Sequence, residues 1–97
     1  MPFVQQTQRF FTKENVETIN PGQFGVYGLF KEGICIYVGK GDIRKRLLDH
    51  LNGDNPCIVK AQPTHWVYEV INGDPSIREK QLITELRPWP ICNERLG

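Results

Sequence analysis

The chain has 97 residues, of which 39% are hydrophobic and 10% aromatic, and its 12 basic and 11 acidic side chains give a net charge of +1. This length predicts one domain over residues 1–97, because so short a chain has no room for a second hydrophobic core. The near balance of charge does not favour a protein that holds a DNA duplex mainly by neutralising its phosphates.

The sequence shows neither a membrane segment nor a secretion signal. No apolar run reaches the length of about 18 residues that a membrane helix needs, and residues 1–5 lack the basic and apolar regions of a signal peptide. The cysteines Cys35, Cys57 and Cys92 form no C-x-x-C pair, so we expect free thiols in a reducing compartment. A zinc site built from Cys57, His65 and Cys92 is the alternative, which the irregular spacing disfavours. We therefore expect a cytoplasmic protein without a membrane partner.

Residues 1–20 read as an arm that docks onto a core over residues 22–95. They include three phenylalanines and a short helical pattern over Lys13–Thr18. Thr12 is a suitable N-cap for that helix, and Asn20-Pro21-Gly22 is a helix stop.

A β-hairpin is predicted next. Phe24–Phe30 and Ile34–Val38 are rich in aromatic and β-branched residues, and the glycine of Lys31-Glu32-Gly33 suits a three-residue hairpin loop. If Phe30 pairs with Ile34 across that loop, Tyr27 lies directly opposite Tyr37 on the same face. A two-residue loop instead places Val38 opposite Tyr27, so the pairing depends on register.

The hairpin is followed by an amphipathic helix from about Asp42 to Leu51. Its apolar residues recur at every fourth position, and Asp42 is a good N-cap. Arg46 and His50 are also four apart, so they stack along a stripe beside the apolar one and form a cationic edge. Arg44 projects into the apolar arc, and we expect its charged group to reach solvent from the first turn.

The chain then passes through a loop and a segment around Cys57–Lys60 to a third strand. Asn52-Gly53-Asp54-Asn55 is a loop-forming sequence. His65–Ile71 alternates between apolar and polar residues, as expected for a strand.

The last predicted helix, Ser76–Leu86, carries a carboxylate where the core should be. Leu82, Ile83 and Leu86 lie three, four and seven positions after Glu79, which is the spacing of one helical face. An unpaired buried carboxylate costs several kcal/mol, so a cation, a metal or a cap should compensate it. Ser76-Ile77-Arg78-Glu79 fits a capping box that needs no chemistry. Asp74-Pro75 is an equally good helix start, which would move Glu79 into the second turn.

Taken in order, these residues resemble the GIY-YIG endonuclease superfamily over residues 25 to 93. The matching elements are Gly25-Val26-Tyr27, Tyr37-Val38-Gly39, Arg46 with His50, Glu79, and Asn93. Each element alone is common, but their joint occurrence in this order is specific. The resemblance implies an α/β (α+β) fold in which helices flank a central three-stranded antiparallel sheet. It also implies metal-dependent hydrolysis of nucleic-acid phosphodiesters.

The resemblance assigns a role to each catalytic residue. Tyr27 would be the general base, Arg46 would clamp the phosphate, and His50 and Tyr37 would hydrogen-bond to Tyr27 or to the phosphate. Glu79 would hold one Mg²⁺ or Mn²⁺ ion, and a single carboxylate suffices because Mg²⁺ keeps most of its waters. A phenol needs nearby positive charge to act as a base at pH 7, and Lys40, Arg46 and the metal could supply it.

The predicted substrate is DNA, cut by a stand-alone catalytic domain. Expected substrate contacts come from Gly39, Lys40, Arg44, Lys45 and Asn93, the last being a structural or a phosphate-side contact. The low net charge means either that tight binding needs a homodimer or a protein partner, or that the substrate is bent or branched DNA recognised by shape. The alternative is a non-catalytic module that keeps the fold and binds nucleic acid or a protein.

Overall fold

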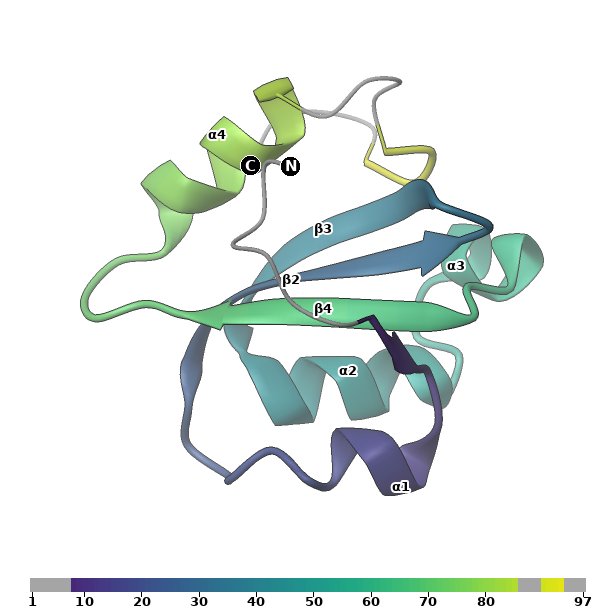
Figure 1. Cartoon of the computed structure of the whole chain (residues 1–97), viewed down its shortest axis with the longest axis horizontal. Coiled ribbons are helices and arrows are strands. Elements are labelled where there is room, and N and C mark those ends of the chain that lie inside the picture. The colour runs from purple at the N-terminus through teal and green to yellow at the C-terminus, as the bar shows by residue number, and fades with distance from the viewer. Residues whose placement is uncertain (1–7, 86–89, 94–97) are drawn as a thin grey trace.

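A computed structural model describes residues 8–85 and 90–93 of the chain. In chain order the elements are β1 (Arg9–Phe10), α1 (Lys13–Val16), β2 (Phe24–Lys31), β3 (Ile34–Asp42), α2 (Ile43–Leu51), α3 (Pro56–Ala61), β4 (His65–Val70) and α4 (Ser76–Glu85). The antiparallel sheet has the order β1-β4-β2-β3, and it is covered by helices on both faces (Figure 1). The expected α+β class is confirmed. The expected sheet of three strands is wrong, because Arg9–Phe10 adds a fourth strand beside β4.

Two apolar clusters lie on opposite faces of the sheet. Tyr27, Leu29 and Trp66 pack with α1, α2 and α3 on one face, whereas Val26, Val38 and other buried residues pack with α4 on the opposite face. Figure 1 shows α4 above the sheet and α1 and α2 below it. A residue of α4 can therefore meet residues from the other face only at the edge of the sheet.

The β2–β3 hairpin has the two-residue loop that was the alternative prediction, but the register at Tyr27 differs from both predicted registers. The turn has two residues, Glu32 and Gly33, which both have positive φ, and Lys31 pairs with Ile34. A bulge after the Phe30–Cys35 pair then shifts the register, so that Tyr27 lies opposite Gly39. Tyr27 and Tyr37 are diagonal neighbours on one face rather than a direct pair. A bulge of one residue leaves no clear signal in the sequence.

The predicted helix starts are confirmed. Thr12 and Asp42 cap α1 and α2 through their side-chain oxygens. At α4, Asp74 Oδ1 accepts a hydrogen bond from the Ser76 N–H at 2.9 Å, and the Glu79 N–H bonds to the Pro75 carbonyl. The Asp74-Pro75 start is therefore the one adopted, and the Ser76 N–H that a capping box would use is bonded to Asp74.

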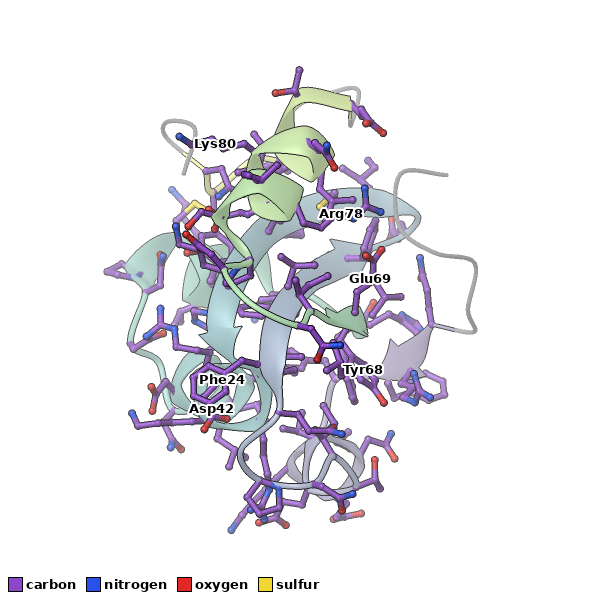
Figure 2. The ribbon with its side chains drawn as sticks, turned by 90° about the vertical axis from the view of Figure 1, so that its left-hand side faces the viewer. Phe24, Asp42, Tyr68, Glu69, Arg78 and Lys80 are labelled. Carbon is purple, nitrogen blue, oxygen red and sulfur yellow. A yellow bond between two sulfur atoms is a disulfide. The ribbon has the colours of Figure 1, made fainter. Side chains whose placement is uncertain are left out.

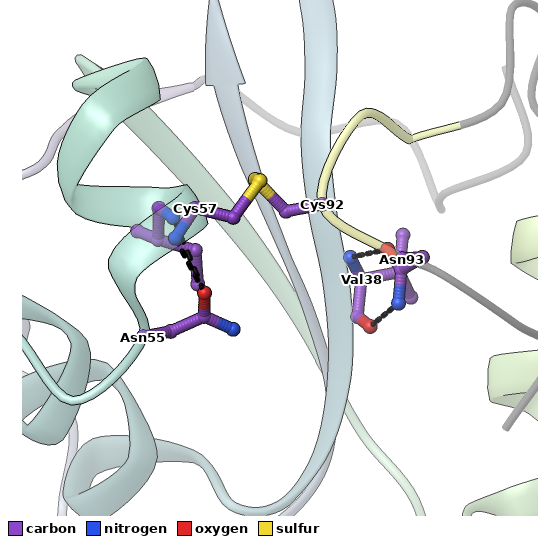
Figure 3. Close-up of a disulfide and its surroundings, with 6 residues drawn as sticks. Val38, Asn55, Cys57, Cys92 and Asn93 are labelled. Carbon is purple, nitrogen blue, oxygen red and sulfur yellow. Dashed lines mark hydrogen bonds between the residues drawn. A yellow bond between two sulfur atoms is a disulfide. The ribbon is translucent and has the colours of Figure 1, made fainter.

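The prediction of three free thiols is wrong. Cys57 at the start of α3 and Cys92 form a disulfide that spans 35 residues of sequence, with their Cα atoms 5.6 Å apart (Figure 3). This bond excludes the alternative zinc site, and His65 instead stacks on Phe10 with ring centroids 4.7 Å apart. Only Cys35 is a free thiol, and it is buried. The sequence could not show that Cys57 and Cys92 meet, because the contact depends on how the chain folds.

The disulfide segment runs along the outer edge of β3. The Cys92 N–H donates to the Ile36 carbonyl at 2.7 Å. The Asn93 amide makes two bonds to one residue, since its Oδ1 accepts from the Val38 N–H and its Nδ2 donates to the Val38 carbonyl (Figure 3). Within residues 8–85 and 90–93, no helix has the length and apolar character needed to cross a bilayer.

Candidate active site

Three aromatic side chains from β2, β3 and α2 meet on one face of the sheet. The Tyr27 hydroxyl and His50 Nε2 are 2.7 Å apart. Tyr37 completes the cluster, with its ring centroid 5.3 Å from that of His50 and 6.2 Å from that of Tyr27. The structure thus brings together the two tyrosines and the histidine that the sequence pattern singled out.

Tyr27 is fully buried, and Gly39 is what makes room for it. A Cβ atom at Gly39 would collide with the Tyr27 hydroxyl and ring, so Gly39 is a packing position, and its contact with the substrate stays a prediction. Burial raises the pKa of Tyr27 well above its ordinary value of 10, and Tyr37 adds to the rise. At neutral pH the Tyr27 phenol is therefore protonated.

Arg46 lies beside both phenols and opposes that rise. Its positive charge and its hydrogen bonding lower the pKa of Tyr27 and of Tyr37. Its guanidinium is also 3.8 Å from Asp49 and 4.0 Å from Asp54, and its side chain is 39% exposed. Arg46 is thus the site residue that both touches the buried cluster and reaches solvent.

His50 does not belong to a cationic edge, contrary to the sequence prediction. Its side chain is 1% exposed, and burial lowers its pKa below the ordinary value of 6.5, although Asp54 partly opposes this. His50 is therefore neutral at pH 7. Its second ring nitrogen, Nδ1, lies 2.8 Å from Asp54 Oδ1. The sequence indicates only that Asp54 belongs to a loop, because a position just after the helix end predicts no side-chain direction.

Glu79 reaches the site from α4, on the opposite face of the sheet. Its side chain is 6% exposed, and its Oε1 lies 3.5 Å from the Lys40 ammonium group of β3. Lys40 also donates a hydrogen bond to Ser76 Oγ at 2.9 Å. Burial raises the pKa of Glu79, and Lys40 lowers it in part. Burial raises the pKa of Tyr37, and the negative charge of Glu79 adds to the rise.

A bidentate ion pair anchors α4 to the sheet. Arg78 donates from Nε and Nη2 to the two carboxylate oxygens of Glu69 in β4, at 2.8 and 2.9 Å. Figure 2 shows these two side chains pointing toward one another. Such paired bonds fix direction as well as distance, and they hold the helix turn that carries Glu79.

Three predicted substrate contacts are not part of this cluster. Arg44 lies 4.0 Å from Glu17, after α1, and Lys45 lies 3.4 Å from Asp49. Both line a hollow beside α2 together with Pro21, Asp42, Leu48 and Asp49. The Asn93 amide makes two hydrogen bonds to the backbone of Val38. This contact fits the structural role predicted for Asn93 rather than the phosphate-side one.

The described part of the chain contains no group of three or more His, Cys, Asp or Glu side chains arranged to hold a metal ion. Glu79 Oε1 is nevertheless a buried oxygen that makes no short hydrogen bond, although the Lys40 ammonium group lies 3.5 Å from it. A buried carboxylate oxygen in this condition is an available ligand for a cation.

Comparison of the chain with protein-family models, with curated proteins and with solved structures found no match in any of the three.

Proposed function

We propose that the protein is a metal-dependent endonuclease that hydrolyses DNA phosphodiester bonds, as its resemblance to the GIY-YIG superfamily implies. One observation carries the proposal. A hydrogen-bonded tyrosine–histidine pair lies on one face of the sheet with Tyr37 and the partly exposed Arg46 beside it, and a buried carboxylate paired with Lys40 of β3 lies on the other face. Sheet packing alone does not require these residue types together.

Hydrolysis needs an activated water, stabilisation of the charge that builds up on the phosphate, and departure of the leaving oxygen. In this proposal the Tyr27 proton passes to His50 Nε2, and the resulting phenolate takes a proton from the attacking water. The water oxygen forms a bond to phosphorus, the bond from phosphorus to the leaving oxygen breaks, and solvent protonates that oxygen. His50 then gives up to solvent the proton that it took from Tyr27, which restores the starting state. Arg46 binds the non-bridging oxygens through paired donors.

Tyr27 can act in this way only if its hydroxyl becomes accessible to water. Arg46 is the neighbouring side chain that reaches solvent. It lies beside Tyr27 and also pairs with Asp49 and Asp54. A phosphate that draws the guanidinium towards itself would uncover the phenol. Substrate binding and activation of the base are thus linked through a single side chain.

The residues present fit one divalent cation. Glu79 supplies a buried carboxylate oxygen that makes no short hydrogen bond, and Mg²⁺ accepts one protein carboxylate when waters and phosphate oxygens complete its shell. A bound Mg²⁺ or Mn²⁺ would polarise the phosphate and stabilise its developing charge. Lys40 at 3.5 Å partly neutralises Glu79, so the ammonium group has to move away when the cation binds.

The proposed partner is DNA. A homodimer or a second protein would increase the affinity for DNA. A cytoplasmic location remains a prediction. The Cys57–Cys92 disulfide weighs against the free-thiol argument for it, since such bonds persist mainly in oxidising compartments.

Two observations favour the second candidate, a non-catalytic module that binds nucleic acid or protein. Tyr27 is fully buried, and the Lys40 ammonium group already pairs with Glu79 at 3.5 Å. In that case binding would depend on Arg46, but Glu79→Ala would leave binding unchanged.

The test is Mg²⁺-dependent cleavage of plasmid and branched DNA by the wild-type protein, Glu79→Ala and Arg46→Ala. Glu85→Ala is the matched control, because it removes an exposed carboxylate from the same helix. We expect nicking by the wild type and the control, and none by the two site variants while circular dichroism shows them folded. Wild-type protein that binds these substrates but cuts none of them with Mg²⁺ or Mn²⁺ would establish the non-catalytic module.

A further inference from the structure

We infer that Asp54 is a positioning residue that holds His50 in the one tautomer able to accept the Tyr27 proton. This inference deepens the proposed function and rests on it for the catalytic consequence. The hydrogen-bond geometry on which it depends stands independently of any activity.

The two ring nitrogens of His50 have separate partners. Nδ1 lies 2.8 Å from Asp54 Oδ1, and Nε2 lies 2.7 Å from the Tyr27 hydroxyl. An ionised carboxylate can only accept a hydrogen bond, so the proton of neutral His50 is on Nδ1. Nε2 then carries the lone pair and accepts from the Tyr27 O–H.

The chain places Asp54 by a tight reversal at the end of α2. Gly53 has φ +87°, and its N–H donates to the His50 carbonyl at 3.1 Å. The Asp54 N–H donates to the Asp49 carbonyl at 3.2 Å. The next residue, Asn55, caps α3 through its side chain (Figure 3). Backbone bonds therefore fix the Asp54 position on both sides, without help from its carboxylate.

Charge explains why a carboxylate at this position helps proton transfer. When Nε2 takes the Tyr27 proton, His50 becomes a cation in a buried place. Arg46 disfavours that cation, whereas Asp54 and, more weakly, Asp49 favour it. Tyr27 from β2 and Tyr37 from β3 are the remaining titratable groups against the ring. Of the described carboxylates, Asp54 is the one within hydrogen-bond distance of His50.

Asp49 provides a matched control. The Asp49 and Asp54 side chains are both 34% exposed, and they lie at similar distances from Arg46, 3.8 and 4.0 Å. Asp49→Asn and Asp54→Asn therefore remove the same charge from the neighbourhood of Arg46. Only Asp54→Asn changes the hydrogen bond to His50.

The first measurement is the tautomer of His50 by ¹⁵N NMR of the ring in the folded protein. We expect Nδ1–H in the wild type and in Asp49→Asn. Asp54→Asn should shift the population towards Nε2–H, and Asp54→Glu, which restores a carboxylate, should shift it back. Nε2–H in the wild type overturns the inference, whether or not the variants fold. An unchanged tautomer in folded Asp54→Asn overturns it as well.

The second measurement is single-site kinetics of DNA cleavage. We expect Asp54→Asn to lower kcat by about 10²- to 10⁴-fold, the range of general acid–base catalysis, with KM changed less than about threefold because Arg46 still binds the phosphate. Asp49→Asn, which leaves the hydrogen bond to His50 in place, should lower kcat much less than Asp54→Asn does. Equal kcat values for the two variants overturn the catalytic role. If the wild type cuts no DNA, the proposed function fails, and the tautomer measurement still decides whether Asp54 positions His50.

Discussion

At pH 7 His50 is a neutral side chain enclosed between Tyr27 and Asp54. Its pKa lies below the ordinary value of 6.5 because burial disfavours the imidazolium form. When the pH falls, the unfolded chain therefore takes up a proton at His50 before the native protein does. Linkage then requires the free energy of unfolding to decrease as the pH drops below about 6.5, and this group adds no pH dependence above that value.

This dependence can be measured by urea unfolding at about pH 7.5 and about pH 5.5. We expect the wild type to lose more stability between these two values than His50→Gln, which has no group to titrate at that position. His65→Gln removes the other histidine and should keep the wild-type loss. Equal losses in the wild type and in His50→Gln would contradict the lowered pKa.

At the scale of elements, the disulfide connects the helix that follows Asp54 to the segment that contacts β3. A cross-link that closes a loop of this size restricts the unfolded chain, and its removal costs about 2–4 kcal/mol. We expect Cys57→Ala/Cys92→Ala, and the wild type in reductant, to show urea midpoints lowered by the same amount. The double variant should not respond to reductant.

A count of reactive thiols gives an independent check. Denatured wild-type protein should show one free thiol, that of Cys35, before reduction and three after it. In the native protein this thiol should be unreactive, because burial raises the pKa of Cys35 to about 12. Three thiols in the unreduced denatured protein would disprove the bond.

The elements with a strong local pattern were the ones that the sequence predicted. α2, its Asp42 cap, the hairpin and the burial of Glu79 all follow from spacing and turn chemistry. The Tyr27–Gly39 register did not follow, because it depends on a single bulge. The partner of His50 did not follow either, since Asp54 is placed by backbone hydrogen bonds after the helix end rather than by helical periodicity.

At the scale of the whole molecule, the net charge is only +1, and few basic side chains lie at the site. Arg46 and Lys40 lie at the site, whereas Arg44 pairs with Glu17 and Lys45 pairs with Asp49. If DNA binds at this site, two neutralised phosphates give a plot of log affinity against log salt with a slope of about −2.

Fluorescence titration of a short duplex by the protein at several salt concentrations would measure that slope. Lys40→Ala and Arg46→Ala should each reduce its magnitude by about one. Arg44→Ala and Lys45→Ala should leave it unchanged. A steep slope that falls in the last two variants would show that DNA follows the outer side of α2 instead.

The contacts of Cys92 and Asn93 have a consequence for self-association. β3 is the last strand on its side of the sheet, and an exposed strand edge is a template on which a second chain can add a strand or begin to aggregate. Here the Asn93 amide hydrogen-bonds to both the N–H and the carbonyl of Val38, and the Cys92 N–H donates to the Ile36 carbonyl. An incoming strand would have to displace these bonds and a disulfide-tethered segment. A homodimer of this protein should therefore form without extending the sheet at β3.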